Sequence, residues 1–374
     1  MKSETTQGNI WYSFPVEQTY TKEYLQANFW KCLYTTGDEN LHYWAILPNS
    51  VKPNKLEPVR INELSITNIG QYVRDDNSPY LEVQVAYEHY EFEMNASDWI
   101  KKKLVMMGEE IIAERVIKGK STGNYLDVLC KKNISGTNII SRFTVLKDYN
   151  NRKGGANYFC IKATCEEEHY EDLSLSMLQI VTNWDLINKS DWQMAELLTP
   201  FMDEFTEPVK FFVPQSWEAK YNKNTNHSFS NYIFEHSMDG KNRGVINSFF
   251  YKTEEFGSVE LLVNSQLARF EIIDDLQALL TPIERVESKE IQNPAVDILY
   301  NIVGTLDSEN ENFHASITVA IIKTLKGWYY FESIGPKPNL QNNYWEVNRR
   351  CIQIMINSFN NLTFEVRDES HFNS

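Results

Sequence analysis

The chain has 374 residues and a formal net charge of −15, with 42% hydrophobic and 13% aromatic residues. This length predicts two or three domains, and the apolar content is enough to fill a core in each. The acidic balance excludes a broad nucleic-acid interface, which needs Lys and Arg to neutralise phosphates, and it disfavours an anionic membrane surface.

The N-terminal residues lack the apolar core of a signal peptide, and no stretch reaches the length of a spanning helix. The cysteine count is odd, and no CxxC spacing occurs, which is typical of reduced thiols in a cytoplasm. We therefore expect a cytoplasmic protein without membrane insertion. Its five cysteines are Cys32, Cys130, Cys160, Cys165 and Cys351.

Residues 1–40 are expected to form an N-terminal extension that packs on a first domain, residues 41–188. Within this domain, Tyr80–Tyr87 alternates apolar and polar residues and predicts a strand. A helix is predicted next, with a cap at Asn95 or Ser97. A closing helix is predicted from apolar residues at helical spacing, namely Leu173, Met177, Ile180, Val181 and Trp184.

Residues 189–207 are too apolar for a free linker and predict a short connecting helix. A second domain is expected over residues 208–362, with one helix carrying Val259 to Phe270 and a closing helix that ends at Phe359. Residues 363–374 are polar and are expected to form a frayed tail.

The two expected domains repeat the same order of sequence elements. Glu114-Arg115-Val116 recurs as Glu284-Arg285-Val286, and strand-like segments follow both. A Gly-bearing turn and an aromatic strand come later in each copy, at residues 153–161 and 325–331. Matching elements in the same order predict a tandem structural duplication.

Each copy is predicted to be an antiparallel β-sheet with helices packed on one face, so the fold class is α+β. The other face is then free to bind something. Phe143, Val145, Ile317 and Val319 are expected to face the helices. Alternation places a more polar set on the open face, namely Arg142, Thr144, His314, Ser316 and Thr318.

No motif in the sequence predicts catalysis, a cofactor or a metal site. Gly119-Lys120-Ser121-Thr122 lacks the opening glycine of a phosphate-binding loop and is interpreted as a polar turn. Cys165 precedes three glutamates, which disfavours a thiolate nucleophile there. His89 and His169 have no converging ligands at metal-site spacing. Asp127 and Asp297 recur at matching positions, for which a turn or edge role is expected.

Three segments carry a resemblance to a known family. They are Phe211-Phe212-Val213-Pro214-Gln215-Ser216-Trp217, then Gly327-Trp328-Tyr329-Tyr330-Phe331, and the final Ile356-Asn357-Ser358-Phe359. Together they resemble the PsbP-like fold, which PsbP, DcrB and the Eag-type chaperones of type VI secretion effectors share. The resemblance is clearest over residues 208–362. It implies a tandem PsbP-like architecture without catalytic residues.

The resemblance implies a non-enzymatic protein-binding adaptor or chaperone, with an apolar segment of a bacterial secretion effector as the natural partner. A structural subunit of a larger assembly, or an enzyme with a pocket between the copies, are the alternatives. The polar set named above is the first candidate partner-binding surface. A groove between the copies, around Trp192 and Leu197, is the second. The oligomeric state is left open.

Overall fold

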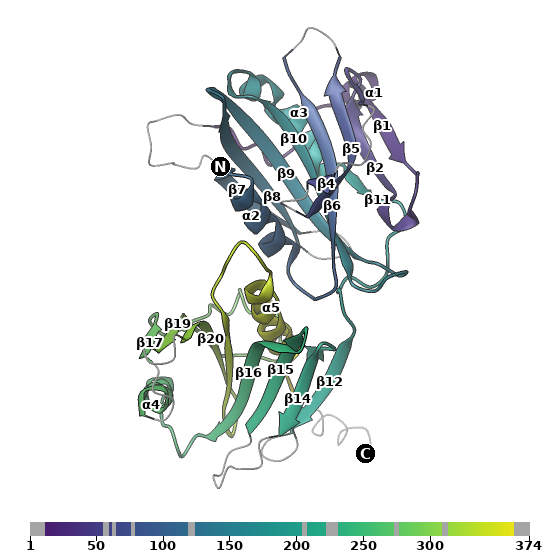
Figure 1. The fold of residues 1–374 in the computed structure, drawn as a ribbon. Coiled ribbons are helices and arrows are strands. Elements are labelled where there is room, and N and C mark those ends of the chain that lie inside the picture. Colours follow the sequence, from purple (N-terminus) through teal and green to yellow (C-terminus); the bar gives the residue numbers. More distant parts are fainter. Residues whose placement is uncertain are drawn as a thin grey trace, which may run out of the picture. The chain divides into compact units, whose positions relative to one another are not determined.

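The structure is a computed structural model (Figure 1). It describes residues 12–54, 60–61, 65–75, 79–118, 124–203, 208–221, 231–272, 277–308 and 313–362. The polar turn expected at 119–122 and the tail expected at 363–374 lie outside these ranges. The chain divides into two compact units, Met1–Ala195 and Glu196–Ser374. None of the helices in the described ranges combines the length and apolarity needed to span a membrane.

The first unit is built on a large antiparallel sheet and a small one. The large sheet has the order β3-β5-β6-β10-β9-β8-β7, with β4 beside β5. Its strands are β3 (Val51–Pro53), β4 (Arg60–Ile61), β5 (Ile66–Arg74), β6 (Glu82–Tyr90), β7 (Glu110–Lys118), β8 (Asn124–Ile134), β9 (Thr137–Tyr149) and β10 (Ala156–Glu166). The small sheet has the order β1-β2-β11, from β1 (Phe29–Tyr34), β2 (Tyr43–Pro48) and β11 (Trp184–Leu186).

Strand β1 lies inside the range expected to be an extension. It pairs with β2 along its whole length, from Phe29 opposite Pro48 to Tyr34 opposite Tyr43. Helix α1 (Lys22–Asn28) precedes it, and the side chain of Thr21 caps this helix by accepting from the backbone N–H of Tyr24. The first unit thus draws part of its sheet from residues 1–40.

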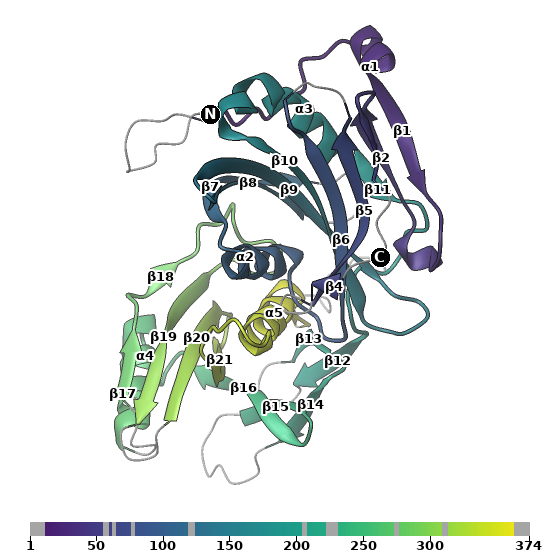
Figure 2. The ribbon, with the colours of Figure 1, turned by 45° about the horizontal axis from the view of Figure 1, so that its top comes forward.

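The two longer helices of the first unit lie on opposite faces of the large sheet. Figure 2 shows α2 (Ala96–Met106) and α3 (Tyr170–Thr182) on either side of β8, β9 and β10. The ring of Trp99 in α2 contacts Tyr158 in β10, with centroids 5.8 Å apart. Met177 in α3 packs with Phe159 and Ile161, the alternate residues of the same strand. The expectation that all helices cover one face is therefore wrong, because apolar residues on both sides of these strands need cover.

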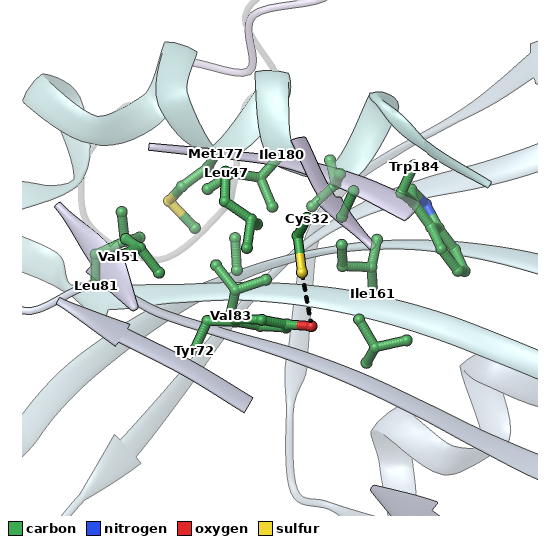
Figure 3. Close-up of a cluster of buried hydrophobic side chains, with 14 of the residues drawn as sticks. Cys32, Leu47, Val51, Tyr72, Leu81, Val83, Ile161, Met177, Ile180 and Trp184 are labelled. Carbon is green, nitrogen blue, oxygen red and sulfur yellow. Dashed lines mark hydrogen bonds between the residues drawn. The ribbon is translucent and has the colours of Figure 1, made fainter. Parts of the chain in front are cut away.

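The core on the α3 side contains the small sheet as well as the helix. Figure 3 shows Leu47 and Cys32 of the small sheet packed toward Val83 and Ile161 of the large one. The Cys32 thiol donates to the Tyr72 hydroxyl at 3.2 Å. Burying these side chains contributes roughly 1.5–3 kcal/mol each relative to leaving them exposed.

The second unit has a similar sheet topology, apart from its short extra strand. Its large sheet has the order β14-β15-β16-β21-β20-β19-β17, with β18 beside β19, and its small sheet has the order β12-β13-β22. The strands are β12 (Leu198–Asp203), β13 (Val209–Pro214), β14 (Trp217–Tyr221), β15 (Asn231–Met238), β16 (Lys241–Lys252), β17 (Gln277–Leu280), β18 (Glu284–Arg285), β19 (Leu299–Ser308), β20 (Phe313–Lys323), β21 (Gly327–Pro336) and β22 (Asn360–Asn361).

The helices of the second unit also take opposite faces. Helix α4 (Val259–Ile272) packs on a core that contains Ile317, Val319 and Tyr330. Helix α5 (Tyr344–Asn357) leads to Phe359, whose ring contacts Tyr329 and Phe331 on the other face. Strands β2 and β13 correspond, because each is the middle strand of its small sheet. Strands β6 and β16 also correspond, because each is the third strand of its large sheet. The strand orders along the main path of each sheet thus match, whereas β4 lies beside the second strand of its large sheet and β18 beside the sixth.

The helix predicted within residues 189–207 is wrong. Residues 198–203 form β12, which pairs with β13, and the described residues before it are irregular. Buried carboxylates replace a helix's own hydrogen bonds there. Asp148 accepts from the backbone N–H of Ser190 at 3.1 Å, and Glu93 accepts from that of Ala195 at 2.7 Å.

We expect Asp148→Asn to stabilise the chain more at high pH than at low pH. Burial raises the pKa of Asp148 to about 7, from an ordinary value of 3.8. Between these values the folded chain binds more protons than the unfolded chain. The stability from Asp148 is therefore complete below about pH 4 and is lost as the pH rises through about 7.

Urea unfolding of the parent and variant across this range measures the effect. From low to high pH, the free energy of unfolding of the variant should rise relative to that of the parent by at most about 4 kcal/mol. A difference that stays constant with pH would contradict the assignment.

Candidate binding surface

In the first unit, an extended segment lies over the α3 side of β7, β8 and β9. We call residues 12–20 the N-terminal strap. Phe14 is its one buried residue, and its ring lies under the guanidinium carbons of Arg142 at 4.6 Å and Arg115 at 5.8 Å. The geometry is that of cation–π contacts on one aromatic ring.

Asp127 holds these two arginines in place. Its carboxylate is fully buried and accepts from Arg142 Nε at 2.9 Å and Nη2 at 2.7 Å, and from Arg115 Nε at 2.7 Å. The arginines then donate to the strap backbone. Arg142 Nη2 donates to the Pro15 carbonyl and Arg115 Nη1 to the Val16 carbonyl, both at 2.8 Å. Recognition through main-chain carbonyls orients an extended segment without depending on its side chains.

The two ends of the strap are held by polar side chains. The Tyr12 hydroxyl donates to Glu167 and accepts from Lys131 Nζ at 2.8 Å, so it bridges an ion pair. At the other end, the hydroxyls of Tyr20 and Ser176 of α3 are 3.0 Å apart. The first unit therefore binds a nine-residue segment of its own chain in the manner of a bound peptide.

The placement of Arg142 and Thr144 on an open face is wrong. Both side chains are buried. The strap covers Arg142, whereas Thr144 donates to the Val181 carbonyl and accepts from Trp184 Nε1 at 2.8 Å. Their polarity serves internal hydrogen bonds beneath α3 and the strap. The turn or edge role expected for Asp127 is also wrong, and no spacing in the sequence joins it to residues 12–20.

The matching face of the second unit is exposed. We call the open face the surface formed by Leu279, Val303, Thr305, Asp307, His314, Ser316 and Thr318. Alternation defines it, because the neighbours Ile302, Ile317 and Val319 point into the core with α4. Leu279 is 76% exposed and Val303 49% exposed, so two large apolar side chains face solvent here. His314, Ser316 and Thr318 thus lie on one surface, while Arg142 and Thr144 do not share its exposure.

The open face and the strap-covered face share cross-strand pairs on three of their strands. Lys131 bonds to Glu167, which follows β10, and Asp307 bonds to Lys337, which follows β21. With Lys131 placed at Asp307, Glu167 lies two positions beyond Lys337, but the partners on the other three strands agree. Asp127 opposite Thr144 matches Val303 opposite Thr318, Leu129 opposite Arg142 matches Thr305 opposite Ser316, and Ala113 beside Leu129 matches Leu279 beside Thr305.

The open face has a charged end and an apolar centre. Asp307 Oδ1 accepts from Lys337 Nζ at 2.9 Å and lies 2.7 Å from His314 Nδ1. Hydrogen bonds from Lys337 and His314 lower the pKa of Asp307 to about 2. Next to them, Val303 and Ser316 stand at the places of Asp127 and Arg142, which form a buried ion pair in the first unit.

The second predicted surface involves Trp192 and Leu197. Trp192 belongs to the first unit and is 36% exposed, and Leu197 belongs to the second unit and is 58% exposed. A groove that joins them stays a prediction.

The groups considered for chemistry have structural surroundings. All five cysteines are free and buried, and burial raises the pKa of both Cys160 and Cys165 to about 12. Such thiols do not ionise at neutral pH. Among the described residues, Glu166, Glu168 and His169 have ligand atoms within 4.8 Å of one another. Glu168 is exposed and lies 3.2 Å from the His169 ring, as in an ordinary surface ion pair.

No family model and no curated protein matches the sequence. Among solved structures, the chain is similar to cyanobacterial PsbP from Synechocystis sp. PCC 6803. The identity is 11%, the match covers 43% of this chain and 91% of that chain, and the TM-score is 0.33. It is also similar to LpqN of Mycobacterium tuberculosis, with 10% identity, coverage of 44% and 96%, and a TM-score of 0.30.

A longer match is to the T6SS immunity protein TplEi from Pseudomonas aeruginosa. It covers 88% of this chain and 96% of that chain, at 8% identity and a TM-score of 0.22. None of these scores is high enough to assign a function to the chain.

Proposed function

We propose that this chain is a protein-binding protein that captures an extended segment of a partner on the open face of its second unit. The observation that carries the proposal is the N-terminal strap. One unit binds an extended segment on this face, and the other exposes Leu279 and Val303 on the corresponding strands β17 and β19. Exposed apolar side chains with a polar rim are typical of protein-binding sites.

The proposal includes the finer functions expected above. We propose a PsbP-like architecture in each unit, and a non-enzymatic role in the cytoplasm as an adaptor or chaperone for an apolar segment of a bacterial secretion effector. The raised pKa values of the buried cysteines support a role without thiol catalysis. A structural subunit and an enzyme with a pocket between the copies are the rival functions.

Capture from a lysate of the source organism, with mass spectrometry, tests the proposal. We expect Val303→Glu and Leu279→Glu to abolish enrichment of the partner, because a carboxylate in an apolar contact is costly to desolvate. Leu325→Glu is the matched control, since Leu325 is 69% exposed but lies in the turn between β20 and β21.

All three variants should melt close to the parent, since exposed substitutions usually change stability by about 0.5 kcal/mol or less. Equal enrichment by parent and Val303→Glu would place the partner elsewhere. Enrichment of an enzyme's substrate or product in place of a protein would favour the enzyme alternative.

A further inference from the structure

We infer that the open face selects a partner segment with the pattern aromatic-x-apolar, in which a tyrosine binds at the charged end and an apolar side chain two residues later covers Val303 and Leu279. This inference rests on the proposed function and specifies its ligand. The strap supplies the pattern, because Tyr12 and Phe14 are two residues apart and contact the two corresponding regions of the first unit.

The charged end favours a tyrosine. In the first unit, the Tyr12 hydroxyl both donates and accepts across the Lys131–Glu167 pair. In the second unit the signs are exchanged, with the anion Asp307 on the strand and the cation Lys337 after β21. A phenol hydroxyl is both donor and acceptor, so it bridges an ion pair in either order. A phenylalanine at this position makes neither bond.

The centre of the open face favours an apolar side chain of the ligand, because Ser316 and Val303 stand there in place of charged side chains. Phe14 rests on Arg142 and Arg115, held by the buried Asp127. In the second unit Ser316 stands at the place of Arg142 and Val303 at the place of Asp127, and the 76% exposed Leu279 lies on the neighbouring strand. Covering these side chains contributes roughly 25 cal/mol per Å² of apolar area removed from water. An acidic side chain at this position of the ligand is excluded by the same surface.

The strap also provides the model for the ligand backbone, which we expect to be extended over two polar side chains of the open face. Ser316 already donates to the carbonyl groups of Gly335 and Pro336, at 3.3 and 3.1 Å. The Thr318 side chain is half-buried on the same face. In the first unit the strap is irregular and extended over residues 12–16, and this geometry places side chains two residues apart on one side.

Fluorescence anisotropy with a labelled peptide of residues 12–20 tests the inference on the full-length chain, whose own strap occupies the first unit. We expect saturable binding, weakened at least about tenfold in the Val303→Glu chain but unchanged in Leu325→Glu. In the peptide, Tyr12→Phe should weaken binding severalfold, and Phe14→Glu should abolish it, whereas Phe14→Leu should retain it.

Equal binding by the Val303→Glu chain, or equal binding of the Phe14→Glu peptide, would overturn the aromatic-x-apolar pattern on this face. The proposed function fails separately. If Val303→Glu loses its captured partner but neither chain binds any of the peptides, the open face still binds proteins and only the pattern is wrong. If the partner is retained and the peptides do not bind, both are wrong.

Discussion

Replacing Asp127 with alanine is expected to lower the free energy of unfolding by about 3–5 kcal/mol. The carboxylate is fully buried and accepts three hydrogen bonds from two arginines. Its removal leaves Arg142 as a buried charge, bonded only to the Pro15 carbonyl among the contacts described above. Equilibrium urea unfolding followed by tryptophan fluorescence measures the loss.

Asp307→Ala is the matched control in the same chain. Asp307 also bonds to two side chains, Lys337 and His314, but it is more than a third exposed to solvent. Exposed ion pairs contribute about 0–1 kcal/mol, so this variant should unfold close to the parent. Equal losses in the two variants would contradict the view that the strap buries the Asp127 cluster.

The sequence predicted the α+β class and the order of elements, because strand alternation and helical spacing are local signals. Helix α2 begins directly after Asn95, one of its two predicted caps, and α4 lies where Val259 and Phe270 predicted it. The sidedness of the helices could not be predicted in the same way. Strands with apolar residues on both faces, such as Tyr158 and Phe159 in β10, give no preference for one face over the other.

The sequence located only the part of the candidate surface that lies in the second unit. Alternation placed His314, Ser316 and Thr318 on one face, but the same rule placed Arg142 and Thr144 there too. The two units differ in a long-range contact. Arg142 donates to the carbonyl of Pro15, more than a hundred residues earlier in the chain, and no local sequence pattern contains such a contact. The polarity of a strand face shows which residues are hydrogen-bonded, and it does not show whether the partner is water or the chain itself.

Phe359→Ala is expected to destabilise the second unit by roughly 3–5 kcal/mol, and Trp184→Ala to destabilise the first unit by a similar amount. Both side chains are buried. They were predicted to end the closing helices, but α3 ends at Thr182 and α5 at Asn357. Trp184 lies in β11 and donates to Thr144, while Phe359 leads into β22 with its ring against Tyr329 and Phe331.

Thermal and urea unfolding of each variant measure these losses. Leu325→Ala, at an exposed turn position, controls for the removal of an apolar side chain and should cost less than about 0.5 kcal/mol. A Phe359→Ala or Trp184→Ala chain that unfolds like the parent would contradict the packing described for that unit.

Site-specific photocrosslinking locates the captured partner on the second unit. A benzophenone amino acid placed at Leu279 reports on the open face, and the same group at Leu325 reports on an equally exposed position outside it. With the captured partner present, we expect a covalent adduct from position 279 and none from position 325, with the crosslinked partner peptide in an extended segment. An adduct from position 325 and none from position 279 would contradict it.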